Sequence, residues 1–220
     1  MRLGCLGCLV VGVAVTAVGI AAAGVIFLSS NILAEPDNVR AVPFTKADGY
    51  RAQQKFYEVL LRQSRRSTRV DPIVLSEREL NAFLSSHLEE TAGLPLSPLS
   101  VALLPHNVVE LRGRTVLKHL MQGVPFAQLT PYLPQNRAEQ LVWVRVRGQI
   151  EMDRDPIRPT GGHGQLEVTE FALGTQPIGA WVLKLMLGQV GRTILRWQVP
   201  RVVQSLETED GRLIVRTTIP

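Results

Sequence analysis

The longest hydrophobic pattern in the chain lies at its amino terminus. Residues 3–28 carry no charge, and Thr16 is the only clearly polar side chain among them. About 20 apolar residues in a helix span a bilayer, so residues 1–30 are predicted to form a transmembrane signal anchor. A cleaved signal peptide is the alternative, with Ala34 at a poor cleavage site. Such peptides have apolar cores of roughly 7–15 residues, so the length of this run favours an uncleaved anchor.

The next stretch of the chain predicts a linker and two helices. Residues 31–44 contain prolines and small polar residues and are expected to form a short stalk. A partly amphipathic pattern predicts a helix over residues 45–66. A second amphipathic helix is predicted at residues 77–89, because Ser76 followed three residues later by Glu79 is the sequence of a capping box.

Residues 178–197 show an almost continuous apolar pattern. A narrow polar stripe at spacing four interrupts it, formed by Lys184, Gly188, Arg192 and Arg196. This spacing predicts a long helix that Pro200 would end. A helix this apolar must be covered over much of its circumference.

The middle of the domain alternates like strands. Residues 99–104 and 108–117 flank a predicted turn at 105–107. A period-two pattern over 142–151, with Trp143 the one apolar side chain on the polar side, predicts a long antiparallel strand with one wet face. Residues 165–173 are expected to return beside it after a Gly- and Pro-rich turn.

The carboxyl-terminal segment adds one more hairpin. Two apolar runs, at 202–208 and 212–218, are separated by a turn that contains Asp210 and Gly211. An Asp-Gly pair between such runs is a strong hairpin signal. The predicted fold class is therefore α+β, with a curved antiparallel sheet packed against two or three helices over residues 45–220.

Charge gives the predicted anchor an orientation. Arg2 precedes the apolar run, and Glu35 and Asp37 follow it. The positive-inside rule then places the amino terminus in the cytoplasm and residues 31–220 outside. The whole chain carries 24 basic and 19 acidic residues, a net charge of +5. This mild excess suits an anionic surface but does not call for nucleic acid as a partner.

The sequence offers little for catalysis or metal binding. Its only cysteines, Cys5 and Cys8, lie in the anchor, so the outer domain has no disulfide. The four histidines are scattered, without the close spacing of zinc ligands. Residues 161–164 are more typical of a flexible turn than of an anion-binding nest. We therefore expect no catalytic residues, no metal and no cofactor.

Two candidate binding surfaces emerge from the patterns. The first is a hydrophobic ligand groove predicted to be lined by Leu80, Phe83, Leu84, Val142, Val144, Val146, Trp181, Leu183, Leu185, Met186 and Leu187. A closed core built from the same residues is the alternative. The second is a basic cluster that would contact an anionic surface, formed by Arg62, Arg65, Arg66 and Arg69. Its alternative is a helix carboxyl terminus whose arginines complement the helix dipole.

Short motifs also suggest a family. The strand-to-helix segment at residues 73–84 resembles that of the YpmS-like family of single-pass, outward-facing bacterial envelope proteins. Four further segments match that family in order: 108–117, 123–126, 171–178 and 199–203. None of these motifs is catalytic. The family is similar to tubular lipid-binding (TULIP-like) domains, in which a curved sheet wraps an apolar helix and leaves a groove.

Together, the anchor, the apolar patterns and the resemblance lead to two hypotheses. In the first, the chain is a membrane-anchored, non-enzymatic envelope protein whose outer domain binds lipid or another hydrophobic ligand. Its partners would be the lipid bilayer and an acyl-chain ligand. In the second, the outer domain is an interaction or scaffolding module that binds another envelope protein and has no ligand cavity.

Overall fold

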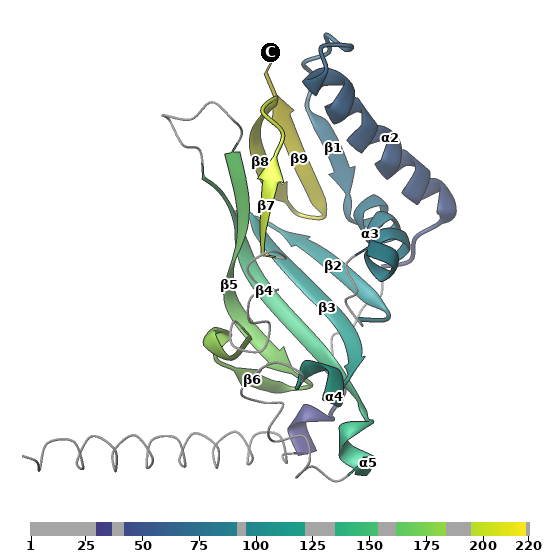
Figure 1. Ribbon diagram of the computed structural model, residues 1–220, viewed down its shortest axis with the longest axis vertical. Helices are drawn as coiled ribbons and strands as arrows, with labels where there is room; N and C mark the ends of the chain where they lie inside the picture. Colours follow the sequence, from purple (N-terminus) through teal and green to yellow (C-terminus); the bar gives the residue numbers. More distant parts are fainter. Residues whose placement is uncertain are drawn as a thin grey trace, which may run out of the picture.

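The computed structural model describes most of the domain that follows the predicted anchor (Figure 1). The described residues are 30–36, 42–91, 96–121, 135–153, 162–183 and 195–218. Within these ranges, no helix combines the length and the apolar character needed to cross a membrane. The apolar run at residues 3–28 lies outside them, so the anchor stays a prediction from the sequence.

The larger of two sheets is curved and antiparallel throughout (Figure 1). Its strands run in the order β2-β3-β4-β5-β6, and β7 also pairs with β5. Their bounds are β2 (Leu99–Leu104), β3 (Val108–Val116), β4 (Leu141–Asp153), β5 (Gly162–Leu173), β6 (Gln176–Ile178) and β7 (Arg196–Val199). The predicted β2–β3 hairpin is confirmed, with left-handed backbone at His106 and Asn107 in its turn.

A smaller, three-stranded sheet lies against one end of the larger one. It has the order β1-β9-β8, with bounds β1 (Ile73–Ser76), β8 (Val203–Glu209) and β9 (Arg212–Thr217). The predicted Asp-Gly hairpin is confirmed, and Gly211 takes φ +71° in its turn. The backbone N–H of Gly211 donates to the carbonyl oxygen of Leu103 at 2.9 Å, and the N–H of Thr208 donates to Asn107 Oδ1 at 3.0 Å. The turn of each hairpin is thus bonded to a strand or turn of the other sheet.

Two capped helices pack beside the smaller sheet. They are α2 (Lys46–Gln63) and α3 (Glu77–Thr91). The predicted capping box of α3 is confirmed, because the Ser76 N–H donates to Glu79 Oε2 at 2.8 Å and the Glu79 N–H donates to Ser76 Oγ at 3.3 Å. The rings of Phe56 and Phe83 lie 4.6 Å apart and join the two helices. Two short helices, α4 (Leu117–Leu120) and α5 (Gln135–Ala138), lie at the far end of the larger sheet.

The predicted helix over residues 178–197 is wrong at both of its ends. Ile178 belongs to β6, and only residues 180–183 are helical in the part that the structure describes. Arg196 and Trp197 lie in β7, and Trp197 is paired with Gly164 of β5. A Cβ atom at Gly164 would collide with the Trp197 indole, so the glycine makes room for this strand. Pro200 therefore follows a strand, and residues 184–194 lie outside the described ranges.

The segment expected as a stalk, residues 31–44, begins with residues that pack against the sheet. Ile32 lies in the short helix η1 (Ser30–Ile32) and is fully buried in the main core cluster. The carbonyl oxygen of Asn31 accepts hydrogen bonds from the Thr175 N–H at 2.9 Å and from Thr175 Oγ1 at 3.1 Å. The chain is therefore held to the β5–β6 turn at Asn31, whereas residues 42–45 have no regular structure.

Candidate functional site

One face of the larger sheet is apolar along its whole length, and we call it the apolar face. It follows from the alternation in β4, where Val142, Val144, Val146, Ile150 and Met152 all point to the same side. The other face of β4 carries Arg145, Arg147, Gln149 and Glu151, together with the buried Trp143 under Arg114. The strand pairing extends this division to the neighbouring strands.

The register explains why neighbouring strands share the apolar face. Val146 of β4 lies opposite Leu111 of β3 and Phe171 of β5. The pairing of β4 with β5 shifts by one residue at Thr169, so that Val168 and Phe171 both fall on the apolar side. Because of this β-bulge, the apolar residues of β5 on both sides of Thr169 lie on the same face of the sheet.

Three apolar clusters form the core of the described domain. The first gathers Val142, Val144, Val146, Phe171, Leu173 and Ile32 near the lower end of the larger sheet. The second lies under α2 and the smaller sheet, and the third lies between α3 and β2. Leu111 packs against both the first and the third cluster, and Leu213 packs against both the second and the third. These two leucines link the three clusters into one apolar surface that crosses both sheets.

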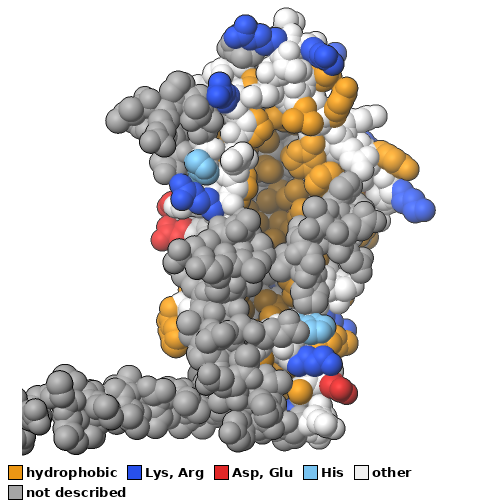
Figure 2. Space-filling view, viewed as in Figure 1, with side chains coloured by type: hydrophobic (Ala, Val, Ile, Leu, Met, Phe, Trp, Pro, Cys, Tyr) orange, Lys and Arg blue, Asp and Glu red, His pale blue; other side chains and the backbone are white. Residues whose placement is uncertain are grey.

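Part of this apolar surface is open to solvent. Figure 2 shows hydrophobic side chains lining a hollow that runs along the long axis, over the β8–β9 hairpin and the central strands of the larger sheet. The clusters also contain side chains that are only partly buried: Leu111, Ile150, Met152, Leu166, Trp197, Leu206 and Leu213. Partly buried apolar residues in a hollow are what a hydrophobic ligand requires.

The structure divides the predicted groove residues among the clusters. Val142, Val144, Val146 and Leu183 are buried in the first cluster, at 8% exposure or less. Phe83 packs on the second cluster, and Leu80 and Leu84 pack on the third. Trp181 joins none of them, because its side chain is 68% exposed and lies beside Gly179. Leu185, Met186 and Leu187 lie outside the described residues.

The predicted groove residues thus do not lie together, and the groove stays a prediction. Its buried residues form closed core at one end of the apolar face. The partly buried residues Ile150, Met152, Leu206 and Leu213 were missed, although Ile150 continues the same alternation as Val146. That alternation could have identified Ile150 and Met152 from the sequence. Leu206 and Leu213 lie in β8 and β9, and only the contact between the two sheets brings them to this face.

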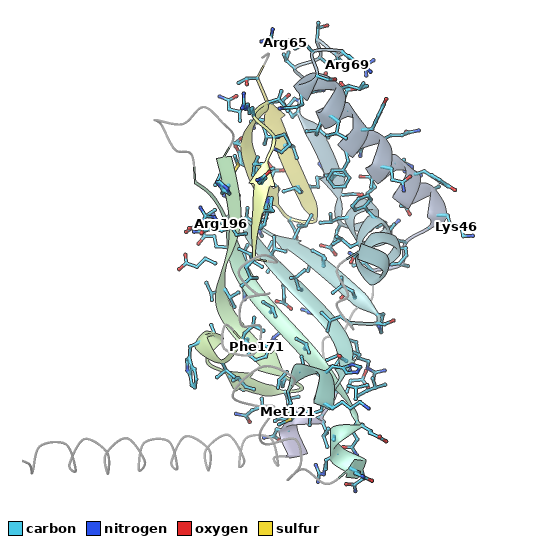
Figure 3. The ribbon with its side chains drawn as sticks, in the orientation of Figure 1. Lys46, Arg65, Arg69, Met121, Phe171 and Arg196 are labelled. Atoms are coloured by element: carbon cyan, nitrogen blue, oxygen red, sulfur yellow. The ribbon has the colours of Figure 1, made fainter. Side chains whose placement is uncertain are left out.

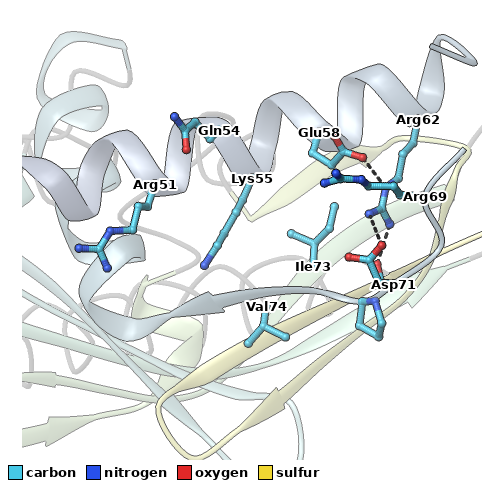
Figure 4. A pocket seen from close by; sticks show the side chains of 10 residues that line it. Arg51, Gln54, Lys55, Glu58, Arg62, Arg69, Asp71, Ile73 and Val74 are labelled. Carbon is cyan, nitrogen blue, oxygen red and sulfur yellow. Dashed lines mark hydrogen bonds and ion pairs between the residues drawn. The ribbon is translucent and has the colours of Figure 1, made fainter. Parts of the chain in front are cut away.

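A second, polar pocket of about 370 Å³ lies between α2 and β1 (Figure 4). Arg62 stands at one end of it and is 1% exposed. Its Nη1 donates to Thr217 Oγ1 at 2.7 Å and to the carbonyl oxygen of Asp71 at 2.8 Å, and its Nε donates to Glu58 Oε1 at 3.1 Å. The prediction that Arg62 contacts an anionic surface is wrong, since its guanidinium is enclosed by these partners.

The other charges around the polar pocket are largely paired. Lys55 Nζ lies 2.7 Å from both carboxylate oxygens of Glu79. Burial raises the pKa of Glu79, but the bonds from Lys55 and from the Ser76 backbone outweigh it and leave that pKa below its ordinary value. A hydrogen bond from the Ser67 hydroxyl, followed by one from Arg62, lowers the pKa of Glu58. The lining of the pocket between α2 and β1 therefore carries four cationic side chains and two carboxylates, and part of its positive charge is paired with Glu79 outside the lining.

The remaining residues of the predicted basic cluster are exposed. We call Arg65, Arg66 and Arg69 the arginine tip. Figure 3 labels Arg65 and Arg69 at the upper end of the molecule, beyond the carboxyl end of α2. Within the described ranges, none of these arginines forms an ion pair, although Arg69 also lines the polar pocket, where its charge helps to lower the pKa of Glu58. In the same ranges, no group of His, Cys, Asp and Glu side chains is arranged to hold a metal.

Comparison with known proteins adds no family. No protein-family model matches the chain, and no curated protein matches it significantly. The resemblance to the YpmS-like family and the similarity to TULIP-like domains therefore stay predictions from the sequence. The candidate site rests on the geometry of the apolar face alone.

Proposed function

We propose that this protein is a membrane-anchored, non-enzymatic envelope protein whose outer domain binds lipid or another hydrophobic ligand in the hollow over the apolar face. One observation carries the proposal: hydrophobic side chains line a hollow over both sheets (Figure 2), and the partly buried Leu111 and Leu213 connect the core clusters of the two sheets. The sequence supports the anchor through residues 3–28, and the anchor would hold the domain beside a source of lipid.

Such a site can bind its ligand without hydrogen bonds or ion pairs to the ligand. Each buried methylene contributes about 0.8 kcal/mol, so eight methylenes of an acyl chain contribute roughly 6 kcal/mol. The partly buried leucines gain from the same contact, because their exposed area leaves water as well. A ligand of this kind is selected by length and shape, so the proposal names a chemical class and no single lipid.

The first experiment asks whether the purified full-length chain carries lipid. Native mass spectrometry after detergent exchange, with extraction and quantification of bound lipid, is expected to show stoichiometric acyl chains. A fluorescent fatty acid should bind the emptied protein and be displaced by unlabelled fatty acid. A chain that carries no lipid and ignores added fatty acid would refute the proposal.

Variants on the smaller sheet locate the site. Leu213→Gln removes an apolar side chain that joins two clusters, and Leu206→Trp fills space beside it. Both are expected to weaken fatty-acid binding at least about tenfold, the effect of 1.4 kcal/mol. Leu141→Gln is the matched control, because Leu141 is 58% exposed at the start of β4 and belongs to none of the clusters. The bulky variant adds packing instead of removing it, so it distinguishes loss of binding from loss of folding.

One observation favours the alternative, an interaction module for another envelope protein. Trp181 is 68% exposed, and exposed aromatic side chains are enriched among the residues that dominate protein interfaces. Crosslinking in the native membrane should then recover a partner that Trp181→Ser loses. The same variant should leave fatty-acid binding unchanged, so the two functions are measured independently.

A further inference from the structure

The arginine tip departs from what helix stability alone would select. The last turn of α2 already contains Arg62, which is enclosed by its partners. Arg65, Arg66 and Arg69 follow the end of the helix, and their side chains are exposed. The helix dipole is felt mainly within the last turn, so it gives little reason for three further arginines.

Arg65 also occupies a backbone position that favours glycine. The helix ends in a Schellman motif, in which the Arg66 N–H donates to the Leu61 carbonyl at 2.9 Å and the Arg65 N–H donates to the Arg62 carbonyl at 3.1 Å. The residue at the left-handed position of this motif is Arg65, with φ 58°. Glycine takes this conformation without the steric cost that a side chain adds. The chain thus keeps a cation at a position where it lowers stability.

Exposed apolar side chains flank the arginine tip. Leu60, one turn before the end of α2, is 57% exposed, and Val70, next to Arg69, is 54% exposed. A soluble anionic polymer would be held by the charges alone. Cations mixed with protruding apolar side chains match a bilayer surface, where headgroups take the charges and the acyl boundary takes the apolar groups.

The position of the arginine tip indicates which surface it can reach. Ile32, where the described chain begins to pack on the sheet, lies at one end of the long axis, and Arg65 and Arg69 lie at the other (Figures 1 and 3). Basic side chains also gather at that upper end in the space-filling view (Figure 2). We propose that the arginine tip, with Leu60 and Val70, docks on an anionic lipid bilayer that faces the end of the domain remote from Ile32. This proposal stands apart from the apolar face and does not require a ligand there.

The test uses the full chain and two vesicle populations. Donor vesicles of phosphatidylcholine carry the protein, and labelled acceptor vesicles contain phosphatidylcholine with or without about 30 mol% phosphatidylglycerol, an anionic lipid. The wild type is expected to capture the anionic acceptors and not the neutral ones. Capture should vanish in 1 M salt, where the screening length is about 3 Å.

Charge variants distinguish binding by the arginine tip from attraction due to the net positive charge of the whole protein. Each cation near such a surface is worth about a fivefold change in binding, so R65Q/R66Q/R69Q should weaken capture about 100-fold. The matched control removes the same charge elsewhere with K118Q/R137Q/R145Q, at residues of α4, α5 and β4. It is expected to change capture less than about threefold. Equal loss in both triple variants, or no loss in the first, overturns the proposal.

One substitution should change thermal stability and vesicle capture in opposite directions. Arg65→Gly relieves the left-handed backbone and should raise the melting temperature by about 2–4 °C while weakening capture about fivefold. A loss of capture in this variant cannot come from unfolding. If the chain does not float with the neutral donor vesicles, the predicted anchor is refuted. Binding of the wild type and the same variants is then measured by sedimentation with anionic vesicles. Sedimentation that is unchanged by R65Q/R66Q/R69Q would again overturn the docking proposal.

Discussion

Replacing Arg62 by methionine tests the assignment of that residue to the core. Methionine keeps the unbranched aliphatic length but removes the charge and every donor. The change breaks the bonds to Thr217 Oγ1 at 2.7 Å, to the Asp71 carbonyl at 2.8 Å and to Glu58 at 3.1 Å. Thr217 is 7% exposed, so its hydroxyl is left largely shielded from water.

The magnitude follows from the burial of the partners. Removing one member of a buried ion pair usually costs about 3–5 kcal/mol. Glu58 is 23% exposed and keeps the hydrogen bond from Ser67, so water and Ser67 compensate part of the loss. We expect the low end, about 3 kcal/mol. For a domain of this size each kcal/mol shifts the melting temperature by about 2–4 °C, which predicts a fall of about 6–12 °C.

The assay is thermal and urea unfolding followed by circular dichroism, with Arg65→Met as the control. Arg65 is exposed, so its variant should lose no stability. The difference in free energy of unfolding between the wild type and Arg62→Met should also become smaller at acidic pH. The pKa of Glu58 is lowered, so its contribution is present above its ordinary pKa of 4.5 and is lost as the pH falls below that value. A variant at Arg62 as stable as the wild type at neutral pH would refute the buried assignment.

Three further substitutions test other joints of the fold. The Asn81 side chain accepts a hydrogen bond from the Val101 N–H at 2.6 Å and donates one to the Val101 carbonyl at 2.8 Å. Asn81→Ala removes both bonds, so urea unfolding should show a free energy of unfolding lower by about 2–3 kcal/mol. Gly174→Ala places a Cβ against the backbone of Ile32 at φ +58°; it should lower the melting temperature and expose residues 30–34 to faster hydrogen exchange. Lys55→Met removes a charge that lowers the pKa of Glu79, so it should destabilise the protein at neutral pH, with the deficit shrinking as the pH falls below 4.5 in a pH series of unfolding curves.

Features with local causes could be predicted from the sequence. The start of α3 depends on two side chains, Ser76 and Glu79, that reach each other's backbone within one turn. The turn between β8 and β9 depends on Gly211, which accepts φ +71°. The alternation along β4 reflects the two environments on either side of one strand. In each case the interacting residues are close in sequence.

Features caused by distant partners were not predictable in this way. Arg62 falls on the polar side of an amphipathic pattern, and only Thr217, 155 residues away, shows that it is enclosed. Ile32 begins a run of only three apolar residues between Asn31 and Glu35, and it is buried beside the β5–β6 turn. Arg196 to Val199 alternate over four residues only, too few to outweigh the apolar run before them. In the structure these four residues pair with β5, where Gly164 leaves space for the Trp197 indole.

Among the described elements, a mismatch in length decides which part of the apolar face is covered. β4 has 13 residues and at 3.3 Å per residue is about 43 Å long. α3 has 15 residues, but at 1.5 Å per residue it is only about 22 Å long. Neither α3 nor the short helices α4 and α5 can therefore run the length of the apolar face, although the alternation makes that face apolar from end to end. Val142 and Val146 are buried in one cluster with Ile32 and Leu117, whereas Ile150 is only partly buried. A sequence pattern identifies which face is apolar, whereas the elements that cover this face decide which of its residues are buried.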